Sequence, residues 1–128
     1  MNKQAIIKFL MVFIGISGSF SVLFGAWLNH GGQALALNEH LSIKTALQYQ
    51  LFHTLALLAS VVWAMNKSTS KILIIACIGF FIGILCFSGS IYIKTFFSFA
   101  IIGKLTPLGG ISLAIAWILL SIEGIKNL

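Results

Sequence analysis

Long apolar stretches separated by short polar segments dominate this chain. Four of them can be distinguished, at about residues 6–28, 43–65, 72–93 and 107–125. Each is close to the ~20 residues with which a helix crosses the ~30 Å hydrocarbon core of a bilayer. Lipid offers no hydrogen-bond partner to a loose backbone, and the sequence lacks the ~10-residue alternating segments of a transmembrane barrel. The pattern therefore predicts an all-α protein, an integral membrane four-helix bundle that forms a single domain over residues 1–128.

The polar segments predict where these helices begin and end. The longest, residues 29–42, contains a helix-breaking glycine pair, so we expect a loop there. The dipeptide Thr106-Pro107 predicts the start of the last helix, with the threonine at its cap and the proline in its first turn. Near the N-terminus, Lys3 and Lys8 precede an apolar run that is too long for a signal peptide. This segment is therefore interpreted as a retained first helix.

Composition and charge agree with a membrane location. Hydrophobic residues make up 59% of the chain and charged residues only 8%, which is typical of transmembrane domains. The formal net charge is +6, but the lysines stand at the ends of the apolar stretches and form no basic stripe with interleaved aromatic residues. We therefore expect no nucleic acid as a partner. Instead, the lysines are expected to snorkel and to contact the head groups of membrane lipids.

The same lysines predict an orientation in the cell membrane. Five lie on the side of the two chain ends, and three lie on the opposite side. The larger group is Lys3, Lys8, Lys67, Lys71 and Lys126, and the smaller one is Lys44, Lys94 and Lys104. Because positive charge favours the cytoplasmic side, we expect both termini of this multi-pass protein to be cytoplasmic.

Small residues at helical spacing predict the faces on which the helices pack. In lipid such residues let two helix backbones approach closely. The predicted packing positions are Ser17, Ser21, Gly25, Gly79, Gly83, Gly109 and Gly110. Faces of this kind are also compatible with a homo-oligomer or with a complex with another membrane protein.

A polar run within the second apolar stretch is the strongest candidate for a site. It covers residues 45–54 and contains an amide pair and a histidine, which are costly to bury in lipid without partners. Polar residues expected at the same end of the bundle extend it to a predicted polar cluster. Its members are His30, Gln48, Gln50, His53, Ser88, Ser90, Tyr92 and Thr106.

This predicted polar cluster has a structural and a functional interpretation, and both stay open at the level of sequence. As structural glue, its amides and histidine hydrogen-bond to the hydroxyl groups of other helices, each bond contributing about 0.6–2 kcal/mol. As a site, the cluster holds a lipid head group, another ligand or a proton.

Several other chemistries are disfavoured. A metal site needs three or four converging ligands, and no carboxylate or thiol is well placed to join the histidines, so we expect no metal and no cofactor. Haem needs only one or two axial histidines, so the number of available ligands argues less strongly against a haem site. A serine hydrolase needs an acid to orient its histidine, but Glu39 and Glu123 both lie outside the cluster, so we do not expect an enzyme. A proton-linked carrier normally uses a carboxylate deep in the membrane, and here it would have to rely on His53.

A set of motifs stands in order along the chain and carries a family resemblance. They are Gly25-Ala26-x-x-x-His30, Thr45-Ala46-x-Gln48-Tyr49-Gln50-x-x-His53, Phe87-Ser88-Gly89-Ser90-x-Tyr92, Leu105-Thr106-Pro107-Leu108-Gly109-Gly110 and Trp117. In these motifs, and over nearly its whole length, the chain resembles the YgdD-like membrane proteins, also called domain-of-unknown-function family 423. Relatives of this family in eukaryotes are known as transmembrane protein 256-like. The resemblance implies a small four-helix integral membrane protein and supplies no reaction.

The chain also departs from the pattern of that family. Leu28 and Asn29 stand where the family tends to have small residues, and Ala116 stands where it tends to have glycine. We therefore expect the loop around His30 to differ in shape.

The function inferred from the sequence is non-enzymatic. We expect a membrane protein that binds lipid or a partner protein and supports membrane integrity or complex assembly. The alternative is a small channel or proton-linked carrier that uses His53, Gln48 and Gln50.

Overall fold

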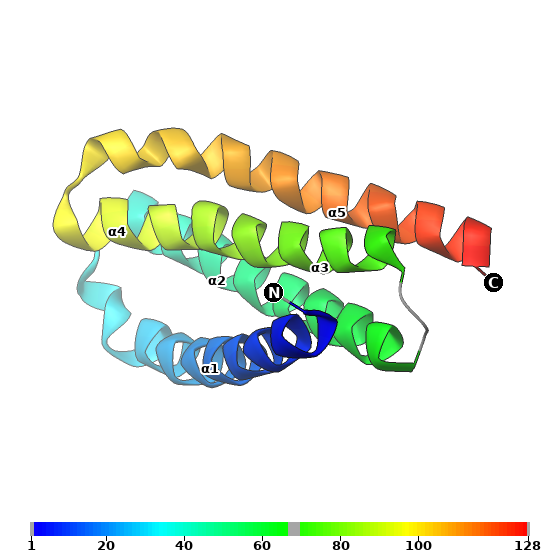
Figure 1. Ribbon diagram of the computed structural model, residues 1–128. Coiled ribbons are helices and arrows are strands. Elements are labelled where there is room, and N and C mark those ends of the chain that lie inside the picture. Colours follow the sequence, from blue (N-terminus) through cyan, green and yellow to red (C-terminus); the bar gives the residue numbers. More distant parts are fainter. Residues whose placement is uncertain (1, 67–69, 128) are drawn as a thin grey trace.

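The computed structural model describes residues 2–66 and 70–127 and folds them into helices, with no strand among these residues (Figure 1). Four segments are long and apolar enough to cross a membrane. They are Lys3–His30, Leu37–Asn66, Lys71–Phe97 and Ala100–Asn127. The prediction of an all-α membrane protein with four spanning helices is confirmed.

The third span is interrupted by a π-helical turn, and the fourth begins with a 3-10 turn. In chain order the elements are α1 (Lys3–His30), a 3-10 turn (Gly32–Ala34), α2 (Leu37–Asn66), α3 (Lys71–Ile84), the π turn (Leu85–Gly89), α4 (Ser90–Phe97), a second 3-10 turn (Ala100–Lys104) and α5 (Leu105–Asn127). We call the end of the bundle with the α1–α2 and α4–α5 connections the loop end. The opposite end, where α1 begins and α5 ends, is the terminal end. The loop end is on the left of Figure 1.

Helix α2 begins well before the expected boundary near residue 43. The expected loop over residues 29–42 is therefore wrong in its second half, which is helical from Leu37 onward. The polar residues of this turn are compatible with a helix that projects out of the core. The Ser42 hydroxyl donates to the Asn38 carbonyl at 3.0 Å, and Glu39 lies in the first turn, where the helix dipole favours a carboxylate.

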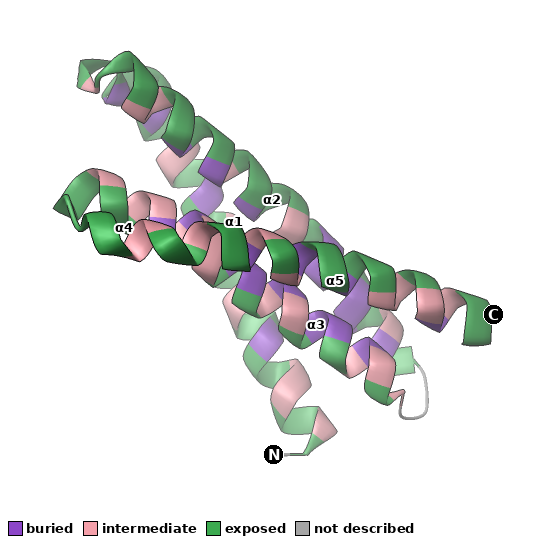
Figure 2. Cartoon of the chain, turned by 90° about the horizontal axis from the view of Figure 1, so that it is seen from above, coloured by how far each residue is buried: buried purple, intermediate pink, exposed green. Residues whose placement is uncertain are grey.

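Helices α2 and α3 form the inner pair of the bundle. In the most apolar window of each span, 39% of the residues are buried in the second and third spans, against 22% in the first and 17% in the fourth. Figure 2 shows the same arrangement, with exposed residues along most of α1 and α5. The core that these helices share consists of Leu10, Ile14, Ala56, Leu57, Val61, Cys77, Phe80, Ile84, Leu113 and Ala116.

Two glycines allow α5 to pack closely against the third span. A Cβ atom at Gly83 would overlap the Leu113 side chain, and one at Gly109 would overlap the backbone of Phe87 in the π turn. At Gly110, by contrast, the nearest atom to such a Cβ is in the Phe87 ring, at 3.8 Å. Only one residue of the predicted glycine pair is therefore required by close approach.

The remaining predicted packing positions also lie at helix contacts. Gly79 faces α5, where an added Cβ would come within 3.2 Å of the Ala116 Cβ atom, and Gly25 faces Leu47 of α2 at 3.3 Å. Ser17 and Ser21 are buried on α1. Small residues on α1 and α3 thus bring these helices close to their neighbours.

A buried carboxylate closes the terminal end. Glu123 of α5 is fully buried and accepts a hydrogen bond from the Ser70 hydroxyl at 2.5 Å. The same hydroxyl oxygen accepts the backbone N–H of Leu73 at 3.3 Å and so caps α3. The acid therefore connects the end of α5 to the start of α3.

Candidate functional site

A hydrogen-bonded group that we call the buried network connects three helices at the middle of the bundle. Its centre is Gln50, which is 7% exposed. The Gln50 amide nitrogen donates to the Ser17 hydroxyl at 3.0 Å, and its amide oxygen accepts from the Tyr92 hydroxyl at 2.7 Å. Ser17 also shares a hydrogen bond with Thr54 at 2.7 Å. The network therefore joins α1, α2 and α4, and it satisfies both polar ends of the buried amide.

A second pair of hydroxyl groups fixes the π turn and α4 to their neighbours. Ser88 donates to the Ala46 carbonyl of α2 at 2.6 Å. Ser90 donates to the Phe87 carbonyl at 2.9 Å and lies 2.6 Å from the Thr106 hydroxyl. Because Ser90 has one proton, Thr106 donates in that pair. Thr106 therefore bonds across to α4 and does not cap α5, which begins one residue earlier.

His53 packs among aromatic rings. Its Nδ1 lies 2.7 Å from the Tyr49 carbonyl, which can only accept, so we infer that Nδ1 carries the proton. The ring centroid lies 6.1 Å from those of Phe80 and Trp117. The expected hydrogen bonds from His53 to the serines or threonine of other helices are not present among the described residues.

Two members of the predicted polar cluster lie outside these groups. Gln48 is exposed on α2, and His30 is exposed at the end of α1. Neither side chain has a hydrogen bond with the residues that the structure describes. Within the same residues, no three His, Cys, Asp or Glu side chains come together as a metal site would require.

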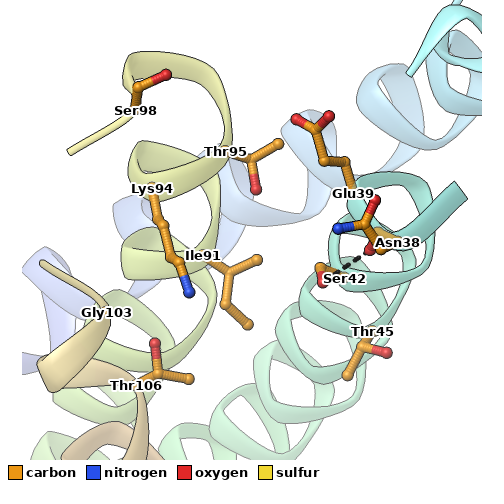
Figure 3. A pocket seen from close by; sticks show the side chains of 10 residues that line it. All are labelled: Asn38, Glu39, Ser42, Thr45, Ile91, Lys94, Thr95, Ser98, Gly103 and Thr106. Atoms are coloured by element: carbon orange, nitrogen blue, oxygen red, sulfur yellow. Dashed lines mark hydrogen bonds between the residues drawn. The ribbon is translucent and has the colours of Figure 1, made fainter. Parts of the chain in front are cut away.

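A polar cavity of about 490 Å³ opens at the loop end, and we call it the loop-end pocket (Figure 3). It lies between the first turns of α2, the end of α4 and the start of α5. Its lining residues are Asn38, Glu39, Ser42, Thr45, Ile91, Lys94, Thr95, Ser98, Gly103 and Thr106. The pocket therefore combines one carboxylate, one ammonium group, five hydroxyl groups and a single aliphatic side chain.

The two charged groups of the loop-end pocket lie on different walls. Glu39 is half-buried on α2, and Lys94 is exposed on α4. Figure 3 shows the Lys94 ammonium group directed toward Thr106 and the Glu39 carboxylate directed away from it. The Lys94 stem runs along Gly103, where a Cβ would lie 3.3 Å from its Cδ atom. No ion pair joins the two groups in the described part of the chain.

Of the residues in the loop-end pocket, the predicted polar cluster contained only Thr106. Asn38, Glu39 and Ser42 were missed because they fall within the segment that was expected to be a loop, and Thr45 was not included in the cluster although it begins the polar run. Their spacing is nevertheless helical: Asn38, Ser42 and Thr45 are separated by four and three residues and share one face. Treating this segment as a projecting helix end would have found that wall of the pocket.

Comparison with known proteins identifies relatives over almost the full length. A family model described as "Protein of unknown function (DUF423)" matches residues 24–110. The chain is 36% identical to a UPF0382 membrane protein of Haemophilus influenzae over 118 residues, which cover 91% of this chain and 94% of the relative. It is 32% identical to the UPF0382 membrane protein YwdK of Bacillus subtilis, with 94% and 99% covered. It is also 32% identical to the UPF0382 inner membrane protein YgdD of Escherichia coli, with 93% and 91% covered. No solved structure matches.

Proposed function

We propose that this chain, which belongs to the DUF423 family of proteins of unknown function, is a non-enzymatic multi-pass membrane protein that binds a membrane lipid in the loop-end pocket. Binding there supports membrane integrity or the assembly of a membrane complex. The observation that carries this proposal is the polar, charged cavity of about 490 Å³ at the end of four membrane-length helices.

The place of the loop-end pocket fits the head-group region of a bilayer. Its walls are the start of α2, the end of α4 and the start of α5, whereas the apolar core consists of residues outside this pocket. A lipid in this position keeps its chains in the hydrocarbon and its head group among the hydroxyl and charged groups. With the termini cytoplasmic, as the lysine distribution favours, the pocket opens to the outer leaflet.

The bonds of the other polar residues support a structural role for them. Ser88 and Ser90 donate to backbone carbonyls, and His53 contacts neither of them through a hydrogen bond in the described residues. A nucleophile and its base have to be within hydrogen-bond reach of each other. We therefore assign the buried network, Ser88 and Ser90 to holding the helices together, and the loop-end pocket to binding.

The proposal is tested by native mass spectrometry of the protein released from mild detergent. Thr45 is exposed and lines the pocket, so Thr45→Trp should fill the cavity without disturbing the core. The matched control is Gln48→Trp, which adds the same ring to an exposed position of α2 outside the pocket. We expect a discrete lipid adduct on the wild type and on the control, and its loss from Thr45→Trp.

Three results would overturn the proposal. The first is a lipid adduct of equal abundance in both tryptophan variants, and the second is only a random distribution of lipids on the wild type. The third is proton or solute flux in proteoliposomes that disappears in a normally folded His53→Ala variant, and this result would favour the carrier.

A further inference from the structure

The loop-end pocket offers two opposite charges to a ligand. Glu39 and Lys94 line it from α2 and α4, and they form no ion pair with each other or with another described residue. Two features favour these positions. The first turn of α2 favours the Glu39 carboxylate through the helix dipole, and Gly103 leaves room for the Lys94 stem. Both charges therefore remain available to an occupant.

Hydroxyl groups without an internal partner surround these charges. Thr45, Thr95 and Ser98 line the pocket, and their side chains form no hydrogen bond within residues 2–66 and 70–127. Such groups can both donate to phosphate oxygens and accept from an ammonium group. The lining therefore suits a ligand that contains both an anion and a hydrogen-bonding cation.

We propose that the loop-end pocket recognises the phosphoethanolamine head group of a zwitterionic membrane lipid, with Lys94 on the phosphate and Glu39 on the primary ammonium group. This inference rests on the proposed lipid binding and names its ligand. A lysine binds phosphate as a point charge, and its place beside Thr106 adds a hydroxyl group to the same end of the pocket.

The composition of the lining separates this head group from the two other common ones. An anionic glycerol head group has no cation for Glu39 and would be repelled by its carboxylate. A choline head group cannot donate a hydrogen bond, and proteins bind quaternary ammonium groups through aromatic cages. None of the 10 residues that line the pocket is aromatic. The lining therefore favours a primary amine.

The test is a competition between lipids with identical acyl chains. The full-length protein is placed in nanodiscs of equal parts phosphatidylethanolamine, phosphatidylglycerol and phosphatidylcholine. It is then transferred to mild detergent, and the lipids retained are counted by native mass spectrometry. We expect phosphatidylethanolamine to be enriched over both of the others.

Two variants and a matched control assign the charges. Glu39→Gln should lower the ratio of phosphatidylethanolamine to phosphatidylglycerol by about twofold to fivefold, the range for a partly solvated ion pair. Lys94→Gln should reduce retention of both phosphatidylethanolamine and phosphatidylglycerol by a similar factor. Lys44→Gln removes an exposed lysine of α2 that does not line the pocket, so it should change neither quantity.

The possible failures are distinguishable. If Thr45→Trp abolishes lipid retention but the wild type shows no preference among the lipids, the head-group assignment is wrong and lipid binding stands. The same conclusion follows if Glu39→Gln leaves the preference unchanged. Retention that does not depend on Thr45 overturns both proposals. If soluble glycerophosphoethanolamine binds as tightly as the lipid, the ligand is a free zwitterion, and the assignment to a lipid is wrong.

Discussion

Replacing Gln50 with leucine tests the buried network directly. The Gln50 amide bonds to Ser17 of α1 and to Tyr92 of α4, so Gln50→Leu removes two contacts between helices at once. Leucine is close to glutamine in volume, so we expect only a small contribution from a cavity. The effect should therefore report on the hydrogen bonds.

The magnitude follows from the two bonds. Hydrogen bonds between helices in lipid contribute about 0.6 kcal/mol on average and up to about 1.7 kcal/mol. Losing both should lower the free energy of unfolding by roughly 1–3 kcal/mol. The matched control is Gln48→Leu, because Gln48 is exposed and has no hydrogen bond in the described part of the chain. Its effect should stay within about 0.5 kcal/mol.

The assay is reversible unfolding in mixed micelles, with increasing dodecyl sulfate and circular dichroism as the signal. A double-mutant cycle with Tyr92→Phe should give a coupling energy of about 0.6–1.7 kcal/mol, because both changes remove the same bond. Equal costs for the two glutamine variants, or strictly additive effects in the cycle, would refute the assignment of Gln50 as the centre of the network.

Three further predictions concern packing and capping. Gly109→Ala should lower the free energy of unfolding by about 1–3 kcal/mol or prevent folding, because its methyl group would overlap the backbone of Phe87. Gly110→Ala should be nearly neutral, and thermal melting in detergent compares the two variants. Ser70→Ala should lower the free energy of unfolding by about 1–3 kcal/mol, because it removes both the cap of α3 and the hydrogen bond to the buried Glu123 carboxylate. The same melting experiment measures this cost, and an unchanged midpoint would contradict both roles of Ser70. N-ethylmaleimide should modify Cys86, which is half-buried, before Cys77, which is 1% exposed. Mass spectrometry of the labelled protein shows the order of modification, and the reverse order would contradict the packing of α3.

The sequence contained enough information for the number of spans and for several of the close approaches between helices. Hydrophobic length alone identified the four spans, because lipid permits few alternatives to a helix. Gly79, Gly83 and Gly109 were predicted as packing positions, and the structure places each of them at a tight contact. Hydrophobic length and the positions of small residues can both be read from one segment of the sequence, without knowing which helix packs against it.

The direction in which polar residues point could not be predicted in the same way. The outside of a membrane bundle is as apolar as its inside, so the hydrophobic pattern does not indicate the buried face. Gln48 and Gln50 are therefore equivalent in sequence, although only Gln50 is buried. The loop-end pocket was also hidden, because its walls come from segments separated by about fifty residues and meet only in the folded chain.

The π turn sets a constraint on chain length. A π turn holds one residue more than an α-helical turn, and one residue corresponds to a rotation of about 100°. Deleting a single residue within Leu85–Gly89 would let the third span run as an uninterrupted α-helix. If the turn instead became α-helical with its residue count unchanged, α4 would rotate by about 100° against α3, so that Ser90 and Tyr92 would turn away from Thr106 and Gln50. The π turn therefore lets the two halves of this span keep their separate partners although the segment holds one residue more than a regular helix needs. A design that removes one residue from this turn should keep those contacts, whereas one that straightens the turn at the same length should lose them.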